Sequence, residues 1–183
     1  EGMDTKHNPE FTMMESYQAY VGYDEIMKMI EDMFGCIAKN AVGKYEVEYQ
    51  GRKINLKPPY RKIGMFEAIK KYGGVDMKKI SELEEAKKVA RKMGVNIDDS
   101  VVNVGKVIEQ VFEEVAEAKL IQPTFLVDYP VEICPLAKKK TGDRRLTERF
   151  ELFITGQEYA NGYSELNDPI EQKKRFEEQL RDK

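Results

Sequence analysis

The sequence RFELFITGQEYANGYSELND, residues 149–168, has the pattern of a β-hairpin. Its first half alternates between apolar residues (Phe150, Leu152 and Ile154) and other residues, which is typical of a half-buried strand. The Thr-Gly pair at 155–156 predicts a two-residue turn. The residues that follow the turn are therefore expected to fold back as a second strand.

Two carboxylates share one face of this predicted hairpin. In the simplest register Phe153 faces Glu158 and Glu151 faces Ala160, so the two glutamates are diagonal neighbours, roughly 7–8 Å apart. Two like charges at that separation repel each other unless a positive charge lies between them. Mg²⁺ that carries phosphates is a suitable cation, because it is commonly held by one or two carboxylates plus substrate phosphates. The alternative is an ordinary solvated hairpin with acidic residues outside.

Further polar residues continue along the second strand. Asn161, Tyr163 and Glu165 alternate there and would point away from the acidic pair if the strand were regular. A β-bulge at Ala160 or Gly162 would shift the phase and bring all of these side chains to one site.

Residues 7–20, HNPEFTMMESYQAY, predict another strand. Phe11, Met13, Glu15 and Tyr17 would then fall on one face. A face that carries an aromatic ring, a carboxylate and a phenol is unsuited to a buried core, because charged groups are seldom fully buried. Such a mixed face suits a pocket. A sheet edge with amphipathic side chains is the alternative.

Residues 21–120 read as a mostly helical, charged insertion with a small β-hairpin. The flanking ranges 1–20 and 121–183 then form one core. Several short elements are expected from periodicity and from cap and turn signals: helices at 24–43, 65–72, 81–93 and 104–120, a hairpin of 45–49 with 53–56, strands at 124–128 and 131–134, and a last helix that Asp168 caps. Asp24 is expected to cap the first helix, and Ser81 to open a capping box for the third.

Composition limits the possible classes of protein. A chain of 183 residues is long enough for one sizeable core, and its net charge of −3 argues neither for nor against a nucleic-acid partner. The basic loop at 138–145 is either solvated or contacts phosphate or RNA. Cys36 and Cys134 are too few and too far apart for a disulfide framework or a zinc site, so reduced thiols in a cytoplasmic protein are expected. No apolar run reaches membrane-spanning length, so no membrane partner is expected.

Three blocks of the sequence resemble the catalytic domain of class II lysyl-tRNA synthetases. HNPEFTMMESYQAY is similar to the second half of motif 2 of that family, and PTFLVDYPVEICPLAK and RFELFITGQEYANGYSELNDPIEQ resemble two further stretches. The resemblance implies an α+β fold, in which helices flank the antiparallel sheet of class II synthetases. ATP would bind over the face of that sheet. The range 21–120 would be the family's insertion after motif 2.

The resemblance also implies roles for individual residues. Glu151 and Glu158 would hold Mg²⁺ against the phosphates. The residues that would contact ATP are Glu1, His7, Asn8 and Phe11, with Phe11 stacked on adenine. The lysine pocket would consist of Glu15, Tyr17, Asn161, Tyr163 and Glu165, with Glu165 and Tyr17 at the ε-ammonium. A buried ammonium needs a paired carboxylate, and Glu165 would be left unpaired by neutral or acidic amino acids.

The implied reaction is attack of the L-lysine carboxylate on the α-phosphorus of ATP, followed by transfer of lysine to tRNA(Lys). No residue is expected to act as a covalent catalyst, since positioning and charge stabilisation carry such reactions. The full-length protein would be a homodimer.

The sequence departs from the family in what it does not contain. The motif 2 arginine, the glycine-rich motif 3 with its arginine, the dimer-forming motif 1 and the anticodon-binding OB-fold are not in these 183 residues. The chain therefore reads as a piece that begins within motif 2 and stops before motif 3. We expect it to have little or no aminoacylation activity alone, and its exposed sheet edges favour association. Two alternatives are a paralogue that attaches a lysine-like residue to a protein such as an elongation factor, and a non-catalytic lysine-sensing module.

Overall fold

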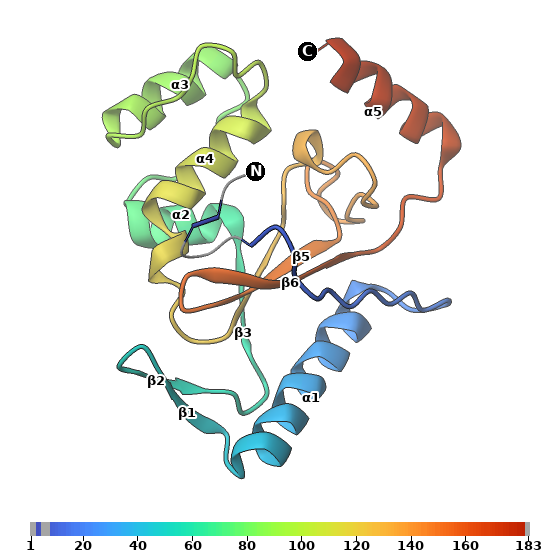
Figure 1. Ribbon diagram of the computed structural model, residues 1–183. Coiled ribbons are helices and arrows are strands. Elements are labelled where there is room, and N and C mark those ends of the chain that lie inside the picture. The colour runs from blue at the N-terminus through green and yellow to red at the C-terminus, as the bar shows by residue number, and fades with distance from the viewer. Residues whose placement is uncertain (1–2, 5–7, 182–183) are drawn as a thin grey trace.

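A computed structural model describes residues 3–4 and 8–181 (Figure 1). Its helices and strands follow in this order: α1 (Tyr23–Val42), β1 (Glu46–Tyr49), β2 (Arg52–Asn55), β3 (Arg61–Gly64), α2 (Met65–Gly73), α3 (Leu83–Lys92), α4 (Val104–Val115), η1 (Glu117–Lys119), β4 (Thr124–Val127), η2 (Val131–Ile133), β5 (Arg149–Ile154), β6 (Gln157–Tyr163) and α5 (Pro169–Arg181). None of the helices in these described ranges is long and apolar enough to cross a membrane.

The main sheet has the strand order β3-β4-β5-β6 in the described part of the chain. β4, β5 and β6 pair antiparallel, whereas β3 pairs parallel with β4. β1 and β2 form a separate small hairpin, as the sequence predicts. This mixture of helices with a largely antiparallel sheet confirms the α+β class.

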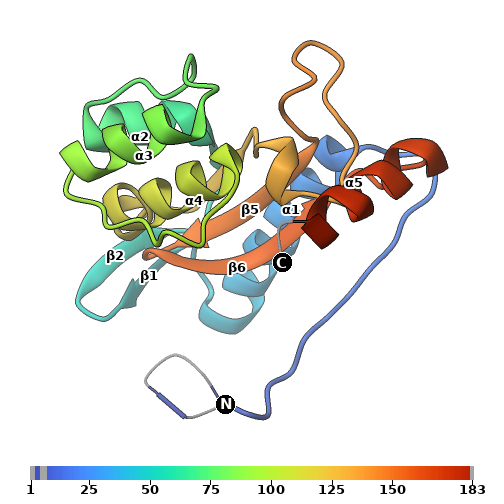
Figure 2. The ribbon, with the colours of Figure 1, turned by 90° about the horizontal axis from the view of Figure 1, so that it is seen from above.

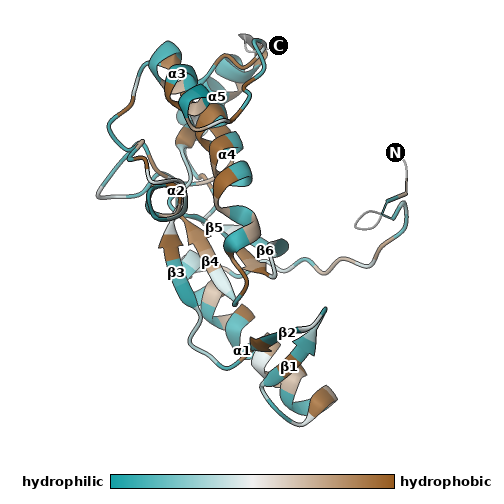
Figure 3. Cartoon of the chain, turned by 90° about the vertical axis from the view of Figure 1, so that its left-hand side faces the viewer, coloured by the Kyte–Doolittle hydropathy of each residue, from teal (hydrophilic) through white to brown (hydrophobic). Residues whose placement is uncertain are grey.

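Helices pack on both faces of the main sheet (Figure 3). Alternation along β5 determines this arrangement, because Phe150, Leu152 and Ile154 point to one face and pack with residues of α1, such as Met27. Phe153 points to the other face and packs with α2, α3 and α4. Helices therefore cover both faces of the sheet. Glu151 lies on the face of β5 that is covered by α4.

The range 21–120 contributes to the same sheet as the rest of the chain. β3 comes from within that range and pairs with β4, and α1 contacts both β5 and β6. The division of the chain into a core and an insertion stays a prediction, and the structure adds that the two parts share one sheet.

The predicted strand at 7–20 is wrong over its described part. Residues 8–20 contain no strand, and the apolar side chains of Phe11 and Met13 are 75% and 68% exposed. Figure 2 shows this segment running away from the body of the molecule. An isolated strand is not stable without a neighbour to accept its hydrogen bonds, and no strand pairs with this segment within the described residues.

Four smaller predictions are also wrong. The strand expected at 131–134 is the 3₁₀ helix η2, in which the Ile133 and Cys134 amides bond back three residues between two prolines. α1 begins after Gly22, whose amide donates to the Glu25 carboxylate at 2.9 Å, so Asp24 is not the cap. α3 begins after Glu82, without the capping box expected at Ser81. The last expected helix of the insertion ends at Val115 and is followed by η1.

Candidate active site

The turn of the β5–β6 hairpin has the predicted two residues. Thr155 and Gly156 have φ angles of 57° and 71°, and two successive positive φ values are the mark of a type I′ turn. Gly156 also lies against the backbone of Ala118, where an added Cβ would come within 2.9 Å of the Ala118 Cα. The turn is therefore held between its own strands and the segment around η1.

A β-bulge sets the phase of the second strand. Phe153 faces Glu158 as predicted, but Leu152 faces Ala160, so Tyr159 is the extra residue. The bulge lies one residue before Ala160 and three before Gly162, the two positions that the sequence suggests. As a consequence Glu151 faces Asn161 and not Ala160, which corrects the predicted register.

This bulge brings the predicted polar residues to one face. Residues that face each other in an antiparallel pair point to the same side of the sheet. Glu158, Asn161 and Tyr163 therefore share the face of Glu151, although Glu158 and Asn161 are three positions apart. The phase shift that we expect from the sequence is thus present.

A cavity of about 340 Å³ opens on this face, between β5, β6 and α4. Five glutamates and one arginine line it within the described part of the chain, together with Tyr129 and apolar residues: the full set is Met65, Glu109, Phe112, Glu113, Glu117, Tyr129, Arg149, Glu151, Phe153 and Glu158. This excess of negative charge favours a cationic ligand.

Arg149 is the cation inside this acidic cavity. Its Nη2 lies 2.5 Å from Glu151 Oε1, and its guanidinium stacks over the Tyr129 ring, 4.5 Å from the ring centroid. Its Nη1 also donates to Cys134 Sγ at 3.4 Å. Arg149 therefore fixes the direction of the Glu151 carboxylate, and the buried ring of Tyr129 supports Arg149 from below.

The pKa values in the cavity reflect its crowding with carboxylates. Partial burial, followed by the nearby charge of Glu151, raises the pKa of Glu158 to about 7. Burial and the charge of Glu109 likewise raise the pKa of Glu113. Ionised Glu158 is thus unfavourable in the absence of a cation, and a bound divalent cation would relieve this cost.

Of the residues expected in the lysine pocket, Asn161 and Tyr163 share the face of Glu151 on the hairpin. Burial, followed by the charge of Glu165, raises the pKa of Tyr163. Glu15 is exposed. Glu165 is tied to Ala137 through an antiparallel bridge. Tyr17 remains 81% exposed, because its segment does not pair with the sheet.

The residues expected to contact ATP are not assembled. Asn8 and Phe11 are exposed and do not line the cavity. Glu1 and His7 lie outside the described residues. The roles of all four stay predictions.

The predicted magnesium site has a donor set that fits. Glu151 and Glu158 offer carboxylate oxygens, which Mg²⁺ prefers, and the charge of Glu151 raises the pKa of Glu158 across one face of the hairpin. Within residues 3–4 and 8–181 no group of three or more His, Cys, Asp or Glu side chains is arranged to hold a metal ion. The arrangement therefore suits a cation that is shared with a ligand, because two carboxylates are too few for a cation held by protein alone.

Sequence reasoning missed several residues that line the cavity. Tyr129 and Arg149 have no signal of their own, since their contact depends on how the segment that follows β4 packs against β5. Glu109, Glu113 and Glu117 did have a signal, because a four-residue spacing places side chains along one side of a helix. No chemistry is assigned to residues 21–120 from the sequence, so this signal is not used there.

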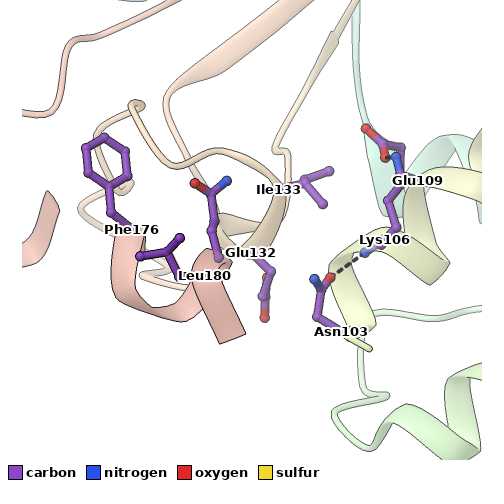
Figure 4. Close-up of a pocket in the computed structure, with 8 residues that line it drawn as sticks. Asn103, Lys106, Glu109, Glu132, Ile133, Phe176 and Leu180 are labelled. Atoms are coloured by element: carbon purple, nitrogen blue, oxygen red, sulfur yellow. Dashed lines mark hydrogen bonds and ion pairs between the residues drawn. The ribbon is translucent and has the colours of Figure 1, made fainter. Parts of the chain in front are cut away.

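Figure 4 shows a second cavity, which, among the described residues, shares only Glu109 with the first. It measures about 620 Å³ and is lined by residues of α4, η2 and α5, which are Asn103, Lys106, Glu109, Glu132, Ile133, Phe176, Gln179 and Leu180. Asn103 caps α4 by accepting a bond from the Lys106 amide, and the Lys106 ammonium pairs with Glu109. These contacts account for Lys106 and Glu109 as partners within α4.

The basic loop before β5 is largely paired with acids of the same chain. Lys139 contacts Glu171 at 2.5 Å, Lys140 pairs with Asp128, and Arg145 contacts Asp143 at 2.7 Å. This pairing favours the structural interpretation of the loop. Contact with phosphate or RNA stays untested.

Comparison with known proteins gives a consistent assignment. The model of the family described as tRNA synthetases class II (D, K and N) matches residues 1–183. The lysine–tRNA ligase of Pelotomaculum thermopropionicum is 52% identical over 181 residues, which are 98% of this chain and 36% of that protein. The lysine–tRNA ligase of Bacillus cytotoxicus is 50% identical over 183 residues, 100% of this chain and 36% of that protein. The lysine–tRNA ligase of Moorella thermoacetica is 50% identical over 180 residues, 98% of this chain and 37% of that protein.

The chain therefore spans little more than a third of the length of these relatives. The match nevertheless covers this chain from end to end, and the acidic hairpin and the α+β fold agree with it. The chain belongs to the class II tRNA synthetases of the D, K and N family.

Proposed function

We propose that this chain is part of the catalytic core of a lysine–tRNA ligase, which activates L-lysine with ATP and transfers it to tRNA(Lys). The observation that carries the proposal is the β5–β6 face, which Glu151, Glu158, Asn161 and Tyr163 share and which ends two residues before Glu165. An anionic nucleotide with its cation and a cationic amino acid both suit this acidic surface.

The phosphate end of the site would use the paired carboxylates. Glu151, held by Arg149, and Glu158 would bind Mg²⁺, which would neutralise phosphate charge when bound. The pKa of Glu158, about 7, supports this role. It shows that the ionised carboxylate is unfavourable in the cavity alone, so a bound cation would be favoured there.

The amino-acid end would use Glu15, Tyr17, Asn161, Tyr163 and Glu165. Glu165 and Tyr17 would accept hydrogen bonds from the ε-ammonium, and the other three would orient the lysine. A fixed carboxylate at this place selects for a cation, because a neutral side chain would leave Glu165 unpaired. Asn8 and Phe11, together with Glu1 and His7, would contact ATP.

The chemistry needs no covalent intermediate with the protein. The lysine carboxylate attacks the α-phosphorus of ATP, the bond to pyrophosphate breaks, and lysyl-adenylate forms. A ribose hydroxyl of the tRNA then attacks the adenylate carbonyl, and AMP leaves. The residues of this chain contribute by placing the reactants, which is a large part of catalysis in such transfers.

The partners and the compartment are part of the proposal. We expect the full-length protein to be a homodimer that binds lysine, ATP and tRNA(Lys). A cytoplasmic location agrees with Cys36 and Cys134, which are both free thiols in the described part of the chain.

Lysine-dependent ATP–pyrophosphate exchange by the full-length protein tests the proposal. We expect Glu165→Gln to raise KM for lysine by at least tenfold, because the ammonium loses its counter-charge. Glu158→Gln should instead raise KM for ATP or lower kcat, with less effect on KM for lysine. Glu48→Gln on the exposed face of β1 removes a distant carboxylate and is the matched control. Exchange that needs no lysine, or that Glu165→Gln leaves unchanged, would contradict the proposal.

A further inference from the structure

A buried arginine of α5 holds a short segment of backbone. Arg175 is 5% exposed, and its Nη1 donates to the carbonyl oxygens of Cys134 at 2.9 Å and Ala137 at 2.7 Å. We call residues 134–138 the strap. Hydrogen bonds from a charged donor are about twice as strong as neutral ones, so Arg175 is the main polar tie between α5 and the strap.

The strap in turn holds the backbone on both sides of Glu165. Ala137 forms an antiparallel bridge with Glu165. The Lys138 amide donates to the Ser164 carbonyl, and the Leu166 amide donates to the Leu136 carbonyl, each at 2.8 Å. The place of Glu165 therefore depends on the place of the strap.

A second contact ties α5 to the end of the strap. Arg175 Nε donates to Glu171 Oε1 at 3.0 Å, and Lys139, which follows the strap, reaches the same carboxylate oxygen at 2.5 Å. Lys139 and then Arg175 lower the pKa of Glu171 to about 2, so this carboxylate stays ionised at neutral pH. Figure 2 shows α5 lying along the loop that contains these residues.

We propose that Arg175 is a positioning residue for lysine recognition, which acts by holding the strap and through it Glu165. This inference rests on the proposed function, in which Glu165 receives the ε-ammonium. Arg175 does not touch the substrate. Its planar fork reaches two carbonyls and one carboxylate at once, which the single ammonium of a lysine side chain does not reproduce.

Arg175→Lys and Arg175→Met in the full-length protein test the inference through pyrophosphate exchange. We expect KM for lysine to rise about tenfold for Arg175→Met and less for Arg175→Lys, while KM for ATP stays within about twofold. The preference for lysine over ornithine, which is one methylene shorter, should fall about tenfold, because a displaced Glu165 no longer discriminates chain length. Lys174→Met is the matched control, since Lys174 is the neighbouring cation and its side chain is 68% exposed.

The possible outcomes separate the inference from the proposed function. KM does not depend on the fraction of folded enzyme, so a variant that is only less stable shows a lower Tm with unchanged KM and preference. That result would overturn the positioning role. If Arg175→Met does not fold, Arg175→Lys decides by the same criterion. If Glu165→Gln leaves lysine recognition intact, the proposed function fails, whatever the Arg175 variants do.

Discussion

At the scale of single residues, the charge of Glu158 depends on its neighbour. Its pKa is raised to about 7 by partial burial and by Glu151. Folding therefore favours the protonated form of Glu158. The stability that protonation contributes is fully present below the ordinary pKa of a carboxyl group, and it is lost as the pH rises through about 7.

Glu151→Gln should lower the pKa of Glu158 toward its ordinary value. The substitution removes a like charge and frees Arg149, whose charge also favours ionised Glu158. A carboxyl ¹³C NMR titration of Glu158 without divalent cations measures the shift, with Glu48→Gln as the control. An unchanged pKa would show that burial alone is responsible, and that the two carboxylates do not form one site.

At the scale of elements, the start of α5 depends on its cap. Asp168 Oδ1 accepts hydrogen bonds from the amides of Ile170 and Glu171, as the sequence predicts. Asp168→Ala should cost about 1 kcal/mol of unfolding free energy, because two helix amides lose their acceptor. Urea denaturation followed by circular dichroism measures the change.

Glu82→Ala is the control for this cap. Glu82 occupies the corresponding position before α3, but its side chain makes no capping bond. Its substitution should leave the denaturation midpoint almost unchanged. If both variants lose the same unfolding free energy, the hydrogen bonds of Asp168 do not stabilise α5.

At the scale of the whole molecule, the 183-residue chain exposes apolar surface along residues 8–20. Phe11, Met13, Met14 and Tyr17 are each at least 68% exposed. β3 and β6 are also the edge strands of the sheet in the described part of the chain. Both features favour association between copies.

We expect the 183-residue chain to self-associate at micromolar concentration in sedimentation velocity. The triple variant Phe11→Ser, Met13→Ser, Met14→Ser should shift the distribution toward monomer, because it removes most of the apolar surface of this segment. Ile170→Ser with Leu180→Ser, which removes exposed apolar residues of α5, is the control. If the control reduces association as much as the triple variant, α5 and not the segment is the contact.

Local patterns predict some of these features and not others. The turn at 155–156, the facing of Phe153 with Glu158 and the Asp168 cap depend on neighbouring residues only, so they can be read from sequence. The sequence predicts a bulge at Ala160 or Gly162, whereas the extra residue is Tyr159. The search for a small residue leads to the wrong position, because pairing with β5 decides which residue is left over and a tyrosine can take that place.

The strands and turn of the acidic hairpin, the α+β class and, through resemblance, the family follow from the sequence alone. Packing between distant segments decides that Arg149 and Tyr129 support Glu151, that α4 adds glutamates to the same cavity, and that Arg175 holds the strap beside Glu165. It also decides that residues 8–20 form no strand within the described chain. The physical reason is that hairpins and caps are held by contacts between residues a few positions apart, whereas a cavity and a paired strand need partners from distant parts of the chain, which periodicity does not encode.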